Sequence, residues 1–133
     1  MSVDYSDLVH GQIISEGCHV LDADAVERYR DAVGDWSKIT SVDGEEVAPP
    51  MAVAALSLRG VIKDLAIPGG ALHAGQELEF KGAVHVGETL RCSAKILQNS
   101  VRGKWRFLVV QLYVETQVDQ RVMEGKSTIM VPA

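Results

Sequence analysis

The sequence has little of several residue types on which whole protein classes depend. Its 133 residues include only two cysteines, Cys18 and Cys92, which lie far apart and form no Cys-x-x-Cys pair. The four histidines are dispersed, so no spacing typical of a zinc site occurs. We therefore expect no metal and no cofactor, and we expect two free thiols in a reducing compartment such as the cytoplasm.

Positive charge is scarce as well. Lys and Arg number 13 against 18 Asp and Glu, which gives a net charge of -5, and the basic residues form no run. No segment carries the ~18 uninterrupted apolar residues that a membrane span needs. Residues 1–5 lack the basic and apolar regions of a signal peptide. These features argue against a nucleic-acid partner, a membrane segment and secretion, and they favour the cytoplasm.

Apolar residues are abundant instead, at 47% of the chain. This is enough for a substantial core and too many for a disordered chain. No repeat, low-complexity stretch or linker interrupts the pattern. Length and composition together predict a single domain over residues 1–133.

A short amphipathic helix is predicted over residues 24–33. Asp24 with Glu27 is a weak capping signal at its start, and Gly34 stands where helices commonly end. Its expected buried stripe follows helical spacing: Val26, Tyr29 and Val33.

A second helix is predicted from Pro49-Pro50 to Leu65, because proline is favoured in a first helical turn. Its first two turns are apolar all round, which predicts burial on every side. The stretch Pro68-Gly69-Gly70 follows its end.

The remaining elements are predicted strands. Residues 10–20 form one, and residues 72–80, 89–97, 105–116 and 122–131 form four more. In the run over 72–80, Leu72, Ala74, Leu78 and Phe80 fall on one face, and His73, Glu77 and Glu79 on the other. The run over 105–116 is apolar on both faces, which predicts a central, covered strand. A buried helix needs a wrapping sheet, so we expect an α+β hot-dog arrangement, with about five curved antiparallel strands around the long central helix. A generic α+β sandwich is the alternative.

Three stretches resemble motifs of the MaoC-like hydratases and dehydratases, which are hot-dog proteins. Ala32-Val33-Gly34-Asp35 resembles the opening of their active-site motif, and Val47-Ala48-Pro49-Pro50-Met51 resembles their entry into the central helix. Residues 72–80 and 84–90 resemble their following strands. The resemblance covers roughly residues 10–132. The proline pair and the His-bearing strand are most similar to the non-catalytic halves of FAS1-like dehydratases.

The resemblance implies addition or loss of water across the C2–C3 bond of an acyl thioester, carried by CoA or an acyl carrier protein. The family uses an Asp and a His five residues later for acid–base catalysis. Asp35 matches the Asp, but Thr40 stands where the His belongs, and no His occurs between His19 and His73. A threonine hydroxyl does not titrate near neutral pH, so it cannot replace an imidazole.

A second family feature is also replaced. The family polarises the thioester carbonyl with the backbone N–H of a glycine at the start of the central helix. Such a donor is typically worth ~3–4 kcal/mol, and Pro50, at that position, has no N–H. The resemblance thus implies that Asp35 is a remnant of the dyad, and its expected role is to satisfy loop backbone groups.

Three hypotheses follow. The first is a non-catalytic subunit of a hydratase or dehydratase, paired with a second, catalytic hot-dog chain or with another copy of itself. Its acyl tunnel would be lined by Met51, Val53, Ala54 and Leu56. The second is an autonomous hydratase or thioesterase with a rearranged site, which uses Asp35 and His73 on a homodimer. The third is an acyl-CoA binding module without a reaction. His73 is expected to be a surface or interface histidine, His85 to be solvated, and Gln76 to sit in a hydrogen-bonded core or interface site.

Overall fold

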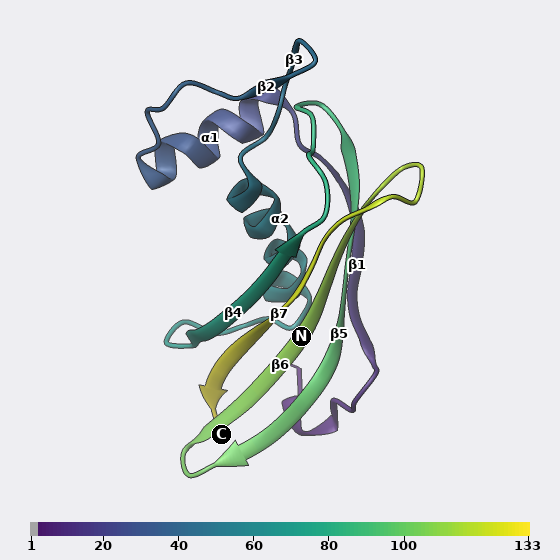
Figure 1. The fold of residues 1–133 in the computed structure, drawn as a ribbon. Helices are drawn as coiled ribbons and strands as arrows, with labels where there is room; N and C mark the ends of the chain where they lie inside the picture. The colour runs from purple at the N-terminus through teal and green to yellow at the C-terminus, as the bar shows by residue number, and fades with distance from the viewer. Residues whose placement is uncertain (1–2) are drawn as a thin grey trace.

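The computed structural model describes residues 3–133 and shows one curved sheet that wraps around a helix (Figure 1). The five antiparallel strands are ordered β1-β5-β6-β7-β4. Their bounds are β1 (Ile13–Val20), β4 (Leu72–Phe80), β5 (Thr89–Arg102), β6 (Trp105–Thr116) and β7 (Arg121–Pro132). The smaller elements are a 3-10 turn (Tyr5–Asp7) and the hairpin β2 (Ser41–Val42) with β3 (Glu45–Glu46). This confirms the expected α+β hot-dog arrangement.

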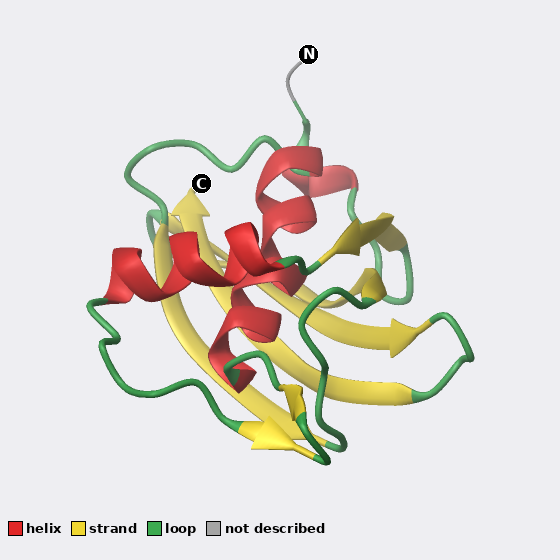
Figure 2. Cartoon of the chain, turned by 90° about the horizontal axis from the view of Figure 1, so that it is seen from above, coloured by secondary structure: helices red, strands yellow, loops and turns green. Residues whose placement is uncertain are grey.

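The long helix α2 (Pro50–Asp64) lies inside the curve of the sheet, and α1 (Ala23–Val33) crosses it (Figure 2). Helix α2 packs chiefly against β1, β5 and β6. The inner side chains of β6 are fully buried beneath it: Leu108, Val110, Leu112 and Val114. The outer side chains of β6, among them Val109 and Tyr113, are only half-buried, so this central strand is not covered equally on both faces.

Helix α2 is not buried on every side, and that expectation is wrong. Val53 and Val61 are at most 2% exposed, whereas Met51 and Ile62 are 48% and 50% exposed. The reason is geometric, because a single curved sheet covers one side of a helix and α1 crosses only part of the rest. The chain therefore leaves an apolar strip of α2 open to solvent.

Helix α1 begins one residue earlier than predicted, and Asp22 rather than Asp24 caps it. The Asp22 carboxylate accepts a hydrogen bond of 2.8 Å from the Ala25 N–H, as an N-cap residue does. Gly34 ends the helix in the left-handed conformation at φ 70°, as predicted. Of the predicted stripe only Val26 is buried, since Tyr29 is half-buried and Val33 is 57% exposed.

Strand β4 contains a bulge that changes which face its first residues occupy. His73 pairs with Ile129 and Gly75 pairs with Thr128, so Ala74 is an extra residue in the ladder. Residues that pair directly share a face, and Ile129 is buried beneath α2. His73 therefore lies on the inner face, and its predicted placement with Glu77 and Glu79 is wrong.

Candidate functional site

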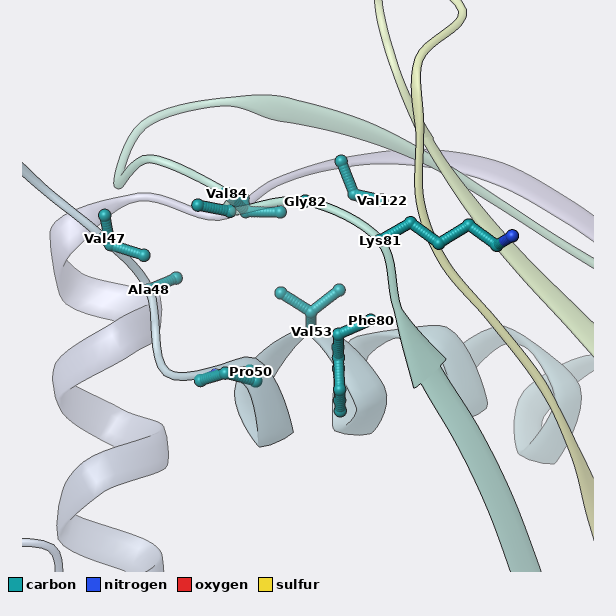
Figure 3. Close-up of a pocket in the computed structure, with 10 residues that line it drawn as sticks. Val47, Ala48, Pro50, Val53, Phe80, Lys81, Gly82, Val84 and Val122 are labelled. Atoms are coloured by element: carbon teal, nitrogen blue, oxygen red, sulfur yellow. The ribbon is translucent and has the colours of Figure 1, made fainter. Parts of the chain in front are cut away.

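The first turn of α2 forms one wall of a cavity of about 390 Å³ (Figure 3). The opposite wall is the segment that leaves β4, from Phe80 to Val84, together with Val122 of β7. Backbone hydrogen bonds fix these walls: the Ala48 N–H donates to the Val84 carbonyl at 2.8 Å, and the Val86 N–H donates to the Glu46 carbonyl at 2.9 Å. The cavity is therefore part of the fold's framework.

The cavity is lined mainly by apolar side chains. Val53, Val84 and Val122 are each 2% exposed and form its inner surface. Lys81 is the charged residue among its lining residues, and its side chain extends away from Val53 and Pro50 (Figure 3). Hydrogen bonding to Glu124, at 3.2 Å, raises the pKa of Lys81. A cavity of this size and character suits the apolar part of a small ligand.

Pro50 is the first residue of α2 and lines this cavity. Its ring replaces a backbone N–H at a position where a helix otherwise presents donors and a partial positive charge. The preceding residue, Pro49, is the N-cap and has no side-chain capping bond. At this position the chain therefore offers no hydrogen-bond donor to a carbonyl oxygen.

Asp35 lies in the loop after α1 and is engaged in a local turn. Its carboxylate accepts hydrogen bonds from the Ser37 hydroxyl at 2.5 Å and from the Ser37 N–H at 3.0 Å. These bonds lower the pKa of Asp35, and the Arg30 guanidinium, 3.9 Å away, lowers it further. A carboxylate held in this way is a weak base, and Asp35 does not line the cavity at Pro50.

Thr40 stabilises the β2–β3 hairpin through its backbone. Its carbonyl accepts a hydrogen bond of 2.8 Å from the Val47 N–H and so closes the base of the β2–β3 hairpin. Its side chain is exposed and does not line the cavity.

The four residues expected to line a tunnel lie on different sides of α2, because each residue of a helix turns by about 100°. Val53 lines the cavity at Pro50, whereas Leu56 lines another cavity between α1 and α2. Ala54 is buried in the core, and Met51 is half exposed. A shared role in substrate binding stays a prediction.

His73 lies at the other end of α2, in an apolar cavity of about 330 Å³. Leu58 and Ile62 of α2 form one side of it, and Ile129 of β7 closes it. Asp35 does not line this cavity, so within one chain the two residues of the autonomous-enzyme hypothesis do not share a cavity. Their meeting across a homodimer stays a prediction. Gln76 donates a hydrogen bond of 3.3 Å to the buried Ser127 hydroxyl, which agrees with its expected place at the edge of the core.

Sequence reasoning did not predict that the segment from Phe80 to Val84 forms a cavity wall, and it placed His85 in solvent. The only signal for the segment was Gly82, which interrupts apolar residues just beyond a predicted strand. The His85 side chain is 34% exposed rather than fully solvated, and its Nδ1 lies 3.5 Å from Glu45 Oε2. Among residues 3–133 no cluster of three or more His, Cys, Asp or Glu side chains is placed to hold a metal, and no helix is long and apolar enough to cross a membrane.

Comparison with known proteins decides the family. A family model described as "FAS1-like, dehydratase domain region" matches residues 8–125. The chain belongs to this family. The match confirms the resemblance to MaoC-like dehydratases and places the protein among the acyl-thioester hydratases and dehydratases. Comparison with curated proteins finds no match.

Solved structures agree on the fold of this FAS1-like dehydratase domain. R-hydratase PhaJ1 from Pseudomonas aeruginosa is 21% identical, with a TM-score of 0.80 over 98% of this chain and 86% of that one. The (R)-hydratase from A. caviae is 19% identical, with a TM-score of 0.78 over 95% and 98%. The HadBC (3R-hydroxyacyl-ACP dehydratase) complex from Mycobacterium tuberculosis is 17% identical, with a TM-score of 0.72 over 98% and 100%.

Proposed function

We propose that this chain is a non-catalytic, substrate-binding subunit of an acyl-thioester hydratase or dehydratase, and that it works beside a catalytic hot-dog subunit. The observation that carries the proposal is Pro50 at the first position of α2, facing an apolar cavity. Relatives use the N–H at this position to stabilise negative charge on the thioester oxygen. With proline at this position the N–H donor is absent, but the cavity is still present.

The acid–base group is missing as well. The loop that would carry the catalytic histidine has Thr40 at the matched position. The remaining carboxylate, Asp35, is occupied by Ser37, and its lowered pKa makes it a poor proton acceptor. Two separate requirements of the reaction are therefore unmet within this chain.

The chain would instead supply walls for the acyl group. The cavity at Pro50 and the cavity at His73 both lie between α2 and β4, at opposite ends of the helix. Helix α2 packs chiefly against β1, β5 and β6, so the space between α2 and β4 is less tightly filled. An acyl chain that entered beside Val53 and Phe80 would run along α2 over an apolar surface.

The open edge of β4 is the surface on which we place the partner. Strand β4 is the last in the sheet, so one side of its backbone has no strand partner. Leu72 of β4 and Ile62 of α2 lie next to this edge, and each is 50% exposed. A second hot-dog sheet that continued the strand order would cover both. The solved HadBC neighbour is itself a complex, which agrees with this arrangement.

The test is reconstitution. The chain is purified alone and together with a hot-dog protein that carries an Asp-x-x-x-x-His loop and is encoded in the neighbouring reading frame. Hydration of crotonyl-CoA is then measured for both samples. Activity of the pair, with none from this chain alone, supports the proposal. Turnover by this chain alone at ordinary enzyme rates contradicts it. Saturable acyl-CoA binding without turnover in either sample would favour a binding module instead.

A further inference from the structure

A cavity of about 300 Å³ lies between α1 and α2, apart from the acyl cavity. One face of each helix lines it. Arg28 and Tyr29 of α1 stand opposite Ala55 and Arg59 of α2, and Leu56 lies deeper. It shares no lining residue with the cavity at Pro50 or with the cavity at His73.

Two arginines from different helices converge on this space without an acidic partner. Arg28 and Arg59 form no ion pair or side-chain hydrogen bond with residues 3–133, whereas nearby Arg30 is paired with Glu27 at 2.9 Å. The one carboxylate that lines the cavity belongs to Asp22, and it is engaged as the cap of α1. The cavity thus has a local excess of positive charge, although the chain as a whole carries -5.

The floor of the cavity is apolar. Leu21 and Leu56 are 3% and 6% exposed, and the Ala55 methyl group adds little bulk above them. Guanidinium groups bind carboxylates and phosphates through paired, planar hydrogen bonds. A volume of 300 Å³ lies at the lower end of the range for small-molecule sites.

We propose that this cavity is a second ligand site, and that it takes an oxyanion on a short apolar stem. The two guanidinium groups bind the carboxylate or phosphate, and the stem lies over Leu21 and Leu56. The site is independent of the proposed acyl-binding role, because its occupation leaves both the cavity at Pro50 and the β4 edge free.

The test uses the full chain and four probes: octanoate, octyl phosphate, 1-octanol and inorganic phosphate. Binding is followed by amide chemical shifts and by calorimetry. Octanoate and octyl phosphate should bind saturably and shift residues of both helices. Octanol lacks the charge and inorganic phosphate lacks the stem, so each should bind at least about tenfold more weakly, a difference of about 1.4 kcal/mol. The tighter binder of the two charged ligands, octanoate or octyl phosphate, identifies the preferred head group.

Four variants distinguish a specific binding site from non-specific attraction of anions. Arg28→Gln and Arg59→Gln should each weaken octyl phosphate binding by about tenfold or more. Lys63→Gln removes a positive charge from the same helix but does not line the cavity, so it should leave binding unchanged. Ala55→Leu keeps both arginines and fills the cavity, so it should abolish binding of the octyl ligands. Inorganic phosphate binding as tight as that of octyl phosphate, or octyl binding unaffected by Ala55→Leu, would overturn the proposal.

Discussion

At the scale of single residues, Pro50 and Asp35 differ in how they depart from the relatives' chemistry. Pro50 removes a donor outright, because its nitrogen carries no hydrogen. Asp35 is retained, but Ser37 binds its carboxylate and lowers its pKa. In this chain Asp35 therefore belongs to a structural turn, whereas Pro50 lines an apolar cavity.

Pro50→Gly restores the missing N–H and should change the kcat of the reconstituted pair by less than about twofold, since the proposed function places the chemistry in the partner. The matching change in the catalytic chain, from the helix-start glycine to proline, should lower kcat by about 10²–10³-fold. Steady-state hydration of crotonyl-CoA measures both. A large gain from Pro50→Gly would show that this chain's own site takes part in the reaction.

Ala83→Leu should make the pair discriminate between acyl chains by length. Ala83 is exposed at the rim of the cavity at Pro50, so the larger side chain narrows the cavity without disturbing the core. We expect KM to rise for a decenoyl thioester and to stay nearly constant for crotonyl-CoA. Ala23→Leu is the control, because Ala23 is also exposed and does not line that cavity. Equal effects on the two substrates would speak against an acyl role for the cavity.

At the scale of elements, Gly125 determines how closely β4 and β7 approach each other. A Cβ placed on Gly125 would lie 2.2 Å from the Glu77 carbonyl oxygen and 3.0 Å from Leu78 Cα. Both are backbone atoms, which cannot rotate away. Glycine at this position therefore allows β4 to approach β7 and to form one wall of both cavities along α2.

Gly125→Ala should destabilise the fold by about 1–3 kcal/mol, in the range of overpacked sites, and lower the melting temperature by several degrees. Gly82→Ala serves as the control. Its added Cβ would meet only a Val122 methyl carbon, at 3.6 Å, which is an ordinary contact. Thermal unfolding followed by circular dichroism compares the two variants. A melting temperature of Gly125→Ala equal to that of the unmodified chain would contradict the expected clash.

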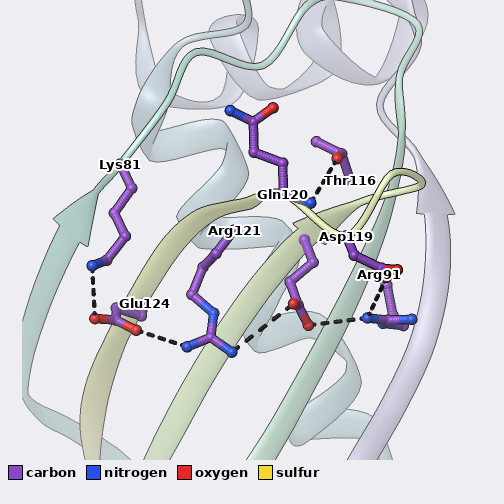
Figure 4. A network of polar contacts seen from close by, with 8 residues as sticks. Lys81, Arg91, Thr116, Asp119, Gln120, Arg121 and Glu124 are labelled. Carbon is purple, nitrogen blue, oxygen red and sulfur yellow. Dashed lines mark hydrogen bonds and ion pairs between the residues drawn. The ribbon is translucent and has the colours of Figure 1, made fainter.

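An ion-pair network on the outer face of the sheet joins β5, β6 and β7 to the residue that follows β4 (Figure 4). It links the end of β4 to β7, β6 and β5 through alternating charges, and Arg121 also stacks on the Tyr113 ring at 4.2 Å. The members are Lys81, Glu124, Arg121, Glu115, Arg91 and Asp119. Hydrogen bonding to Lys81 lowers the pKa of Glu124 below its ordinary value of 4.5.

Because the folded pKa of Glu124 is lowered, its stabilising contribution is present above pH 4.5 and is lost as the pH falls through the folded value. Glu124→Gln should therefore reduce stability at pH 7 and flatten the loss of stability between about pH 5 and pH 3. Urea unfolding at several pH values measures this. Glu16→Gln, in which the carboxylate has no ion pair among the described residues, should leave the slope unchanged. The Glu124 effect should also shrink at high salt.

The sequence predicts the elements better than it predicts their details. The helix after Pro50, the end of α1 at Gly34 and the four final strands all appear, because each depends on local periodicity or on a residue with a special conformation. Strand β5 is longer than predicted, since it continues beyond residue 97 to Arg102. The bulge at Ala74 could not be predicted, since alternation alone does not show where a ladder gains a residue. The sequence also did not predict the solvent exposure of Met51 and Ile62 on α2, because this exposure depends on how far the sheet extends around the helix.

At the scale of the whole molecule, the chain has one well-covered half and one open half. Strands β1, β5 and β6 hold α2 from one side, while β4 forms an unpaired edge beside exposed apolar residues of the helix. An edge of this kind favours addition of another sheet. The proposed partner would therefore complete a fold that this chain builds only in part.

Leu72→Glu should weaken assembly with the catalytic partner, because it puts a charge on the β4 edge where the apolar contact is expected. Leu72 is 50% exposed, so the unpaired chain should tolerate the change. Val101→Glu is a matched control, since Val101 is also 50% exposed but lies near the far end of β5. Light scattering on size-exclusion fractions measures assembly. Equal assembly by both variants would place the interface elsewhere.

The two cysteines differ in a way that has a practical consequence. Burial, together with the nearby Cys18, raises the pKa of Cys92 to about 12, so its thiol stays protonated and is only 7% exposed. Cys18 is exposed on β1, at the opposite edge of the sheet from β4. Alkylating reagents attack the thiolate of accessible cysteines. Cys18 is therefore the cysteine that a fluorophore or spin label would modify, and it lies on the edge of the sheet opposite the proposed partner surface.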